Sequence, residues 1–242
     1  MTWLHLAVAV VSVVAGVTAS ISGFGIGSLL TPLLAFSLGT PVAVAAVALP
    51  HAAATVLRAW RLRRAVDWDL FRRFGLWSAV GGLAGALVFA RLGGEILTRV
   101  LGGLLVLTAV SVLTGWASRV TLPRWAAWLL GLLSGFFGGL VGNQGGLRAG
   151  ALLGLGLAPA TFVATSTMSG VIVDAVRTPL YVLRAGAAIL DVWTLVAVAT
   201  LGTVAGTLLG ERALPGISPE RFRTLVGALV GVLGVWLLVG PA

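Results

Sequence analysis

The segment Gly135–Gly150 places polar and charged side chains in an otherwise apolar stretch, and its one arginine is the first candidate for chemistry. A buried arginine costs at least ~2.5 kcal/mol on membrane-insertion scales, so Arg148 must face a partner, a cavity or a ligand. A permanent ion pair with Asp174 is the alternative to a ligand. Because a paired arginine can still present one face to an anion, the two interpretations are compatible. With Asn143 and Gln144 nearby, the segment predicts an anion site.

A second glycine-rich segment, Ser20–Pro32, offers backbone amides and hydroxyl groups rather than a charge. Its glycines are spaced to expose amides, and amides at the N-terminus of a half-helix carry a partial positive charge that attracts anions. A glycine-rich contact between two helices is the alternative explanation of this pattern. The candidate substrate-binding residues of the two segments are Ser22, Gly23, Gly25, Gly27, Asn143, Gln144, Gly145, Gly146 and Arg148.

Two further ionisable residues are candidates for proton coupling, His51 and Asp174. His51 follows Pro50 in an apolar run, and the histidine side chain changes charge near neutral pH. A hydrogen-bonded packing histidine is the alternative. Asp174 is three residues before Arg177, so the two side chains can also pair along one helical face. The hydroxyl residues expected to line the same cavity are Thr165, Ser166, Thr167 and Ser169.

The motifs of the common enzyme classes are missing from the sequence. It has no cysteine, no HExxH, no GxxxxGK loop and no GxSxG elbow, and its two histidines are too few for a clustered metal site. We therefore expect no catalytic residue, no metal and no cofactor, and a protein that is not an enzyme. Since no ATP site is present, any transport must be passive or ion-coupled.

The composition places these residues in a membrane protein. Of 242 residues, 59% are hydrophobic and 10% are charged, with a mean hydropathy of +1.09, whereas soluble domains carry about a quarter charged residues. Every positive charge is an arginine, and the arginines cluster between apolar runs, as expected for loops facing the cytoplasm. The net charge of +9 therefore reflects topology, and no nucleic-acid partner is expected. We expect Trp3 to begin a retained helix rather than a cleaved signal.

Charges, prolines and glycines divide the chain into ten apolar runs. Most are long enough to span a bilayer core of ~30 Å, and two are short and glycine-rich. We expect Gly81, Gly82, Gly85, Gly202 and Gly206 to lie at close helix contacts. The runs are Trp3–Ser22, Gly23–Leu38, Pro41–Leu57, Phe74–Ala90, Ile96–Gly115, Trp125–Val141, Gly145–Leu157, Pro159–Leu183, Ile189–Gly210 and Phe222–Val239.

The order of long and short runs is the same in both halves, which predicts an internal duplication. At an offset of 118 residues Gly27 falls on Gly145 and Pro41 on Pro159. We therefore expect two repeats, residues 1–117 and 124–242. The arginine cluster from Arg58 to Arg73 should be cytoplasmic. If the short runs cross the membrane the repeats are inverted, and if they re-enter the repeats are parallel; inversion is favoured.

At this point the sequence resembles the TauE/SafE family of membrane transporters. GFGIGSLLTPLLAFSLG at 23–39 is similar to the first copy of the family's repeated glycine motif, and GLVGNQGGLRAGALLGLGL at 139–157 is similar to the second. The second copy has Gly150 where the family commonly has proline. The resemblance implies a carrier of the cell inner membrane, in a family linked to the export of sulfite and organosulfonates.

Taken together, the sequence predicts an all-α, polytopic transmembrane helical bundle of two homologous repeats, each with a short glycine-broken helix. The predicted function is secondary transport, as a probable exporter, of a small anion such as sulfite or an organosulfonate, by alternating access at the repeat interface. The expected partners are the small anionic substrate and the lipid bilayer, and a homo-oligomer stays open. A small-anion channel and a membrane-embedded protein without transport activity are the alternatives.

Overall fold

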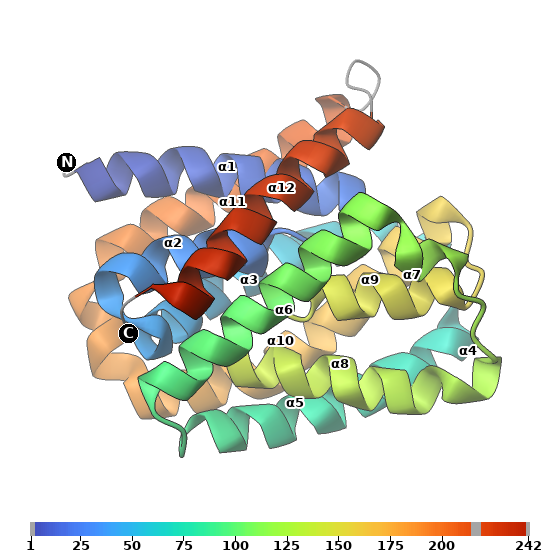
Figure 1. Cartoon of the computed structure of the whole chain (residues 1–242), viewed down its shortest axis with the longest axis horizontal. Coiled ribbons are helices and arrows are strands. Elements are labelled where there is room, and N and C mark those ends of the chain that lie inside the picture. The colour runs from blue at the N-terminus through green and yellow to red at the C-terminus, as the bar shows by residue number, and fades with distance from the viewer. Residues whose placement is uncertain (1–2, 214–218, 241–242) are drawn as a thin grey trace.

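The computed structural model describes residues 3–213 and 219–240, and within these residues it is built of helices with no β-strand. Figure 1 shows most helices running roughly along the long axis of the molecule. Short connecting turns are η1 (Arg63–Ala65), α4 (Trp68–Leu70), η2 (Phe71–Gly75), α7 (Trp116–Arg119) and η3 (Arg124–Ala126). The longer helices are α1 (Trp3–Ser22), α2 (Ile26–Leu38), α3 (Thr40–Leu62), α5 (Leu76–Phe89), α6 (Gly94–Thr114), α8 (Ala127–Val141), α9 (Gly145–Gly154), α10 (Pro159–Asp191), α11 (Trp193–Ala213) and α12 (Pro219–Val239).

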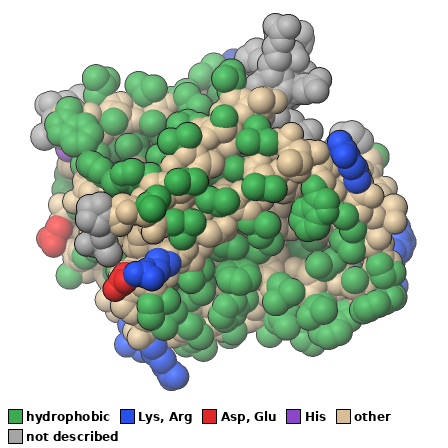
Figure 2. All heavy atoms as spheres, in the orientation of Figure 1, with side chains coloured by type: hydrophobic (Ala, Val, Ile, Leu, Met, Phe, Trp, Pro, Cys, Tyr) green, Lys and Arg blue, Asp and Glu red, His purple; other side chains and the backbone are tan. Residues whose placement is uncertain are grey.

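The outer surface of the bundle is suited to lipid. Within the described residues, five helical stretches are long and apolar enough to cross a membrane. Figure 2 shows hydrophobic side chains over the visible face, with the few charged ones toward its margins. The chain is therefore a multi-pass membrane protein, and the predicted all-helical membrane bundle is confirmed. The five stretches are Trp3–Ser22, Thr40–Ala65, Gly94–Thr114, Arg124–Val141 and Trp193–Arg212.

Glycines let two pairs of helices approach backbone to backbone. A Cβ placed on Gly81 of α5 would lie 2.8 Å from the amide nitrogen of Phe136 in α8. A Cβ on Gly206 of α11 would lie 2.9 Å from the Cα of Val13 in α1. Contacts this close leave no room for a side chain, which is how helices associate tightly in lipid. The glycines predicted to lie at helix contacts, Gly81, Gly82, Gly85, Gly202 and Gly206, all do so.

The interior of the bundle is formed by α3 and α10, which pack against each other. The short helix α2 packs on α1 and α3, and the short helix α9 packs on α6, α8 and α10. The two short helices are the ones the glycine-rich segments predicted. Their first turns are buried, because α2 buries Ile26, Gly27 and Ser28 and α9 buries Gly145 and Arg148. The fold therefore brings two helix N-termini into its centre.

Candidate functional site

The two glycine-rich turns meet inside the bundle. Gly25 precedes α2 with a φ of 140°, and Gly142 ends α8 with a φ of 71°, conformations that glycine adopts most easily. A Cβ on Gly27 would collide with the carbonyl oxygen of Gly142. The Oγ of Ser28 donates to the Oδ1 of Asn143 over 2.9 Å. Segments more than a hundred residues apart in the chain thus form one structure.

A small polar cavity of about 10 Å³ lies where the two turns meet. Its lining includes the first turns of both α2 and α9, whose N-terminal amides have no partner within the helix. A volume of roughly 10–15 Å³ accommodates one water molecule, so this cavity has room for about one water. The lining residues that the sequence predicted are Gly23, Gly25, Gly27, Asn143, Gln144, Gly145 and Arg148, with His51 beside them.

Arg148 is buried at the cavity with only part of its guanidinium satisfied. Its side chain is 1% exposed, and its Nε donates to the Oγ of Ser166 over 2.9 Å. Its Nη1 is buried and has no hydrogen-bond partner. Among the described residues, no carboxylate lies within ion-pair distance of Arg148, so the alternative of a permanent pair with Asp174 is not observed. The arginine remains available to an anion.

Arg58 is a second cavity-lining arginine. It was expected in the cytoplasmic arginine cluster, but it lies within α3 and is 2% exposed. Its Nε donates to the Oγ1 of Thr167 over 2.9 Å, and its buried Nη1 has no partner. His51, Thr55 and Arg58 are spaced i, i+4, i+7, which puts them on one helical face. That spacing is the signal that identifies Arg58.

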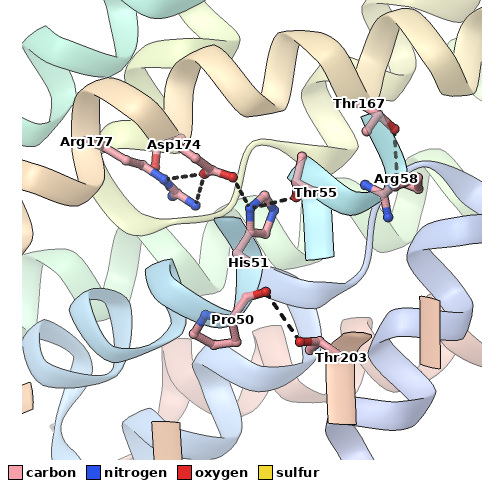
Figure 3. A network of polar contacts seen from close by, with 9 residues as sticks. Pro50, His51, Thr55, Arg58, Thr167, Asp174, Arg177 and Thr203 are labelled. Carbon is pink, nitrogen blue, oxygen red and sulfur yellow. Dashed lines mark hydrogen bonds and ion pairs between the residues drawn. The ribbon is translucent and has the colours of Figure 1, made fainter. Parts of the chain in front are cut away.

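Both carboxylate oxygens of Asp174 have partners, in Arg177 and His51. Its Oδ1 accepts from Arg177 over 2.9 Å at Nε and 2.8 Å at Nη2, and its Oδ2 lies 2.7 Å from the Nδ1 of His51. Figure 3 shows His51 between this ion pair and Thr55, with Arg58 further along α3. The sequence-predicted pairing of Asp174 with Arg177 is therefore present. Asp174 does not line the cavity but lies behind His51.

The charges buried in this region do not balance. Among the described residues, the buried charged side chains are Arg58, Arg148, Arg177 and Asp174. The pairing of Asp174 with Arg177 leaves two guanidinium groups without a carboxylate. Desolvating an ion costs several kcal/mol, and an uncompensated buried charge is strongly destabilising. The cavity is therefore electrostatically suited to an anion with two negative charges.

Uncharged donors with no partner face the same region. The Nδ2 of Asn143 and the Nε2 of Gln144 are buried without a hydrogen-bond acceptor. A buried donor left unpaired costs about 1–3 kcal/mol, so these amides also favour a bound acceptor. Within residues 3–213 and 219–240 no group of three or more histidine, aspartate or glutamate side chains is placed to hold a metal ion.

Some predicted site residues lie elsewhere. The Oγ of Ser22 donates to the carbonyls of Thr18 and Phe24, and Ser22 is not part of the cavity lining. Gly146 packs against Thr108 and lines a separate apolar cavity of about 380 Å³ on the other side of α9. Of the hydroxyl residues on α10, Ser166 accepts a hydrogen bond from Arg148 and Thr167 accepts one from Arg58. Ser169 bonds back to its own helix, and Thr165 accepts from the backbone of Asp67.

A family model described as "Sulfite exporter TauE/SafE" matches residues 8–237, nearly the whole chain, and the match includes both glycine turns and the two cavity-lining arginines, Arg58 and Arg148. No curated protein and no solved structure matches the chain.

Proposed function

The chain belongs to the TauE/SafE family of membrane transporters, and from this premise we propose that it carries a sulfur oxyanion out of the cell across the inner membrane. The family accounts for transport of sulfite or a related anion. The substrate, the outward direction and the carrier mechanism are the proposal. The site would consist of the two glycine turns with Arg58 and Arg148.

The single observation that carries this proposal is the pair of buried guanidinium groups without a carboxylate. The sulfite dianion would neutralise both. A guanidinium group presents parallel N–H donors that match two oxygens of an oxyanion, and the free Nη1 atoms of Arg58 and Arg148 provide such donors. The amides of the α2 and α9 N-termini, with Asn143 and Gln144, would bind the remaining oxygens.

The small volume of the cavity supports a carrier rather than an open pore. Sulfite has four heavy atoms and needs more room than the cavity of about 10 Å³ provides, so the surrounding helices must move to admit it. Short helices broken at glycines near the middle of a bundle are the usual binding elements of secondary transporters. We therefore assign alternating access to the two halves of the molecule, with the cavity as the fixed site between them.

The proposal is tested with purified protein in proteoliposomes loaded with radiolabelled sulfite. The wild type should release label with saturating kinetics. Arg58→Gln and Arg148→Gln each remove a charge-assisted contact worth about 1.5–3 kcal/mol, so apparent sulfite affinity should fall about 10- to 100-fold. Arg119→Gln is the matched control, because this arginine is exposed in α7 and should leave flux unchanged.

The outcomes separate the alternatives. Efflux that rises linearly with sulfite concentration and depends little on temperature would indicate a channel. No efflux above protein-free liposomes would indicate a membrane protein without this activity. Equal losses in the control and the two site variants would remove the arginines from the site. Competition by an alkylsulfonate, which carries one charge, should be weaker than competition by unlabelled sulfite.

A further inference from the structure

His51 connects the anion cavity to the buried Asp174–Arg177 ion pair. We propose that His51 binds a proton when the anion binds, so that each anion crosses the membrane together with a proton. This inference rests on the proposed transport of a divalent oxyanion. It adds a second transported species and gives the direction of coupling, which is cotransport rather than exchange.

The hydrogen bonds around His51 determine which nitrogen can accept a proton. Nδ1 lies 2.7 Å from the Oδ2 of Asp174 and 3.3 Å from the Oγ1 of Thr55. A carboxylate only accepts, so Nδ1 carries the hydrogen and donates it to Asp174. In the neutral ring Nε2 then has a lone pair, and among the described residues it makes no hydrogen bond. Nε2 is the atom that accepts the proton.

The charged groups that face His51 favour a proton only when the anion is present. Arg58 comes from the same helix, Arg148 from α9, and Asp174 with Arg177 from α10. Asp174 is already paired with Arg177, and the other two arginines repel a positive imidazolium. A dianion in the cavity offsets both arginines and removes this repulsion. Since binding couplings are reciprocal, the proton on His51 strengthens anion binding equally.

The ion pair also connects His51 with the end of α8. The Nη1 of Arg177 donates to the carbonyl of Gly138 over 2.6 Å, and the hydroxyl of Tyr181 donates to the carbonyl of Gly139 over 2.5 Å. These carbonyls belong to the last turn of α8, directly before the turn at Gly142. A protonated His51 competes with Arg177 for Asp174. The charge on His51 therefore acts on the helix end that leads into the anion site.

The proton balance of one cycle is simple. A proton from the solution on the side where the anion enters, delivered as hydronium, adds to Nε2 and gives an imidazolium paired with Asp174. When the site opens on the other side the anion leaves, the repulsion from the arginines returns, and the proton passes from Nε2 to water. His51 ends the cycle neutral, and one proton has moved with one anion.

The test uses the full chain in proteoliposomes whose membrane potential is clamped with potassium and valinomycin. The pH on both sides stays above the second ionisation of sulfite, so the dianion predominates throughout. With the outside more acidic, the wild type should accumulate radiolabelled sulfite above the external concentration. His51→Gln should lose this accumulation, and the exchange of labelled for unlabelled sulfite that it retains should show a lower apparent affinity, because His51 lines the cavity. His5→Gln, the other histidine of the chain, should behave as the wild type.

Each outcome bears either on proton coupling through His51 or on the proposed function. Accumulation by His51→Gln equal to the wild type overturns the inference. A wild type that exchanges sulfite but ignores the pH gradient also overturns it, and leaves the proposed function intact. A wild type that does not exchange sulfite contradicts the proposed function itself. If His51→Gln is inactive in exchange, an internal pH dye on the wild type decides instead: one proton entering with each anion supports the inference, and none overturns it.

Discussion

Arg148 occupies space that a glycine leaves open. A Cβ on Gly170 of α10 would lie 3.0 Å from the Nη1 of Arg148 and 3.2 Å from the Cγ2 of Thr55. Gly170→Leu should therefore displace the guanidinium and raise the KM for sulfite about tenfold, the effect of losing ~1.4 kcal/mol. Gly186→Leu is the control on the same helix, since nothing lies within 4 Å of its Cβ position. Initial rates of sulfite efflux measure both, and an unchanged KM in Gly170→Leu would contradict the assignment of Arg148.

The buried pair of Asp174 and Arg177 gives a prediction for stability. Asp174→Asn leaves the Arg177 guanidinium buried without its carboxylate, which should lower the free energy of unfolding by about 3–5 kcal/mol. Adding Arg177→Gln should restore part of the loss. Asp69→Asn breaks an exposed pair with Arg73 and should cost at most about 1 kcal/mol. Thermal unfolding in detergent compares the variants, and equal effects of Asp174→Asn and Asp69→Asn would contradict this account.

How far individual residues could be predicted depended on their surroundings in the sequence. Arg148 stands in an apolar stretch, so its burial and function follow from its cost in lipid. Arg58 is followed closely by Arg61, Arg63 and Arg64, so the sequence grouped it with the arginines expected to be cytoplasmic. Its helical register with His51 separates it from them. Side-chain partners such as Ser166 for Arg148 depend on helix packing, which no spacing in one segment gives.

At the scale of helices, glycine contacts determine how close α5 and α8 lie. Gly139→Ala would place a Cβ against the carbonyl of Gly82 and 2.8 Å from the amide nitrogen of Ala86. Overpacking of this kind costs about 1–3 kcal/mol, so the melting temperature in detergent should fall. Nothing lies within 4 Å of the Cβ position of Gly103 on α6, so Gly103→Ala should leave the melting temperature unchanged. A similar melting temperature for both variants would contradict tight packing of α5 on α8.

The broken helices could be predicted, and their orientation could not. Glycine-rich, shortened runs located α2 and α9 to within a few residues. Sequence periodicity did not show which face of α9 lies toward the cavity. Arg148 and Gly145 face it, whereas Gly146 packs on Thr108 because α6 approaches from the other side. The choice between these faces is made by a helix distant in sequence, and this is why Gly146 was included among the predicted site residues.

At the scale of the whole molecule, one end carries the arginine cluster at and after the end of α3, Arg61, Arg63, Arg64, Arg72 and Arg73. Arg61 pairs with Glu211 over 2.5 Å, which joins the ends of α3 and α11, and Arg73 and Arg124 line one surface pocket. Figure 1 shows the start of α1 and the end of α12 at the opposite end of the molecule. By the positive-inside rule we expect the arginine-rich end to face the cytoplasm.

This orientation predicts labelling from opposite sides, and the absence of native cysteine makes the experiment direct. Arg64→Cys should be protected from a membrane-impermeant maleimide in intact cells and labelled after lysis. Gly93→Cys, in the connection between α5 and α6, should be labelled in intact cells. The reverse pattern would invert the orientation.

The arrangement of helices supports the two predicted repeats, which we propose as residues 1–117 and 124–242. The shortest of the longer helices stands second in each half, since α1, α2, α3, α5 and α6 have 20, 13, 23, 14 and 21 residues and α8 to α12 have 15, 10, 33, 21 and 21. The partners cross between the halves, since α1 packs on α11 and α8 packs on α5, while α3 meets α10 and α6 meets α12. A two-fold relation between the halves would produce this pattern, and the shared cavity would lie near its axis.

The two unpaired guanidinium groups also affect the unloaded protein. Changing the access of an empty site, which holds two uncompensated positive charges in the low-dielectric interior, costs more than changing the access of a site whose arginines are offset by an anion. The return of the vacant carrier should therefore be the slow half of each turnover. Adding unlabelled sulfite to the receiving side should then accelerate the release of labelled sulfite, and an unchanged rate would show that another step limits the cycle.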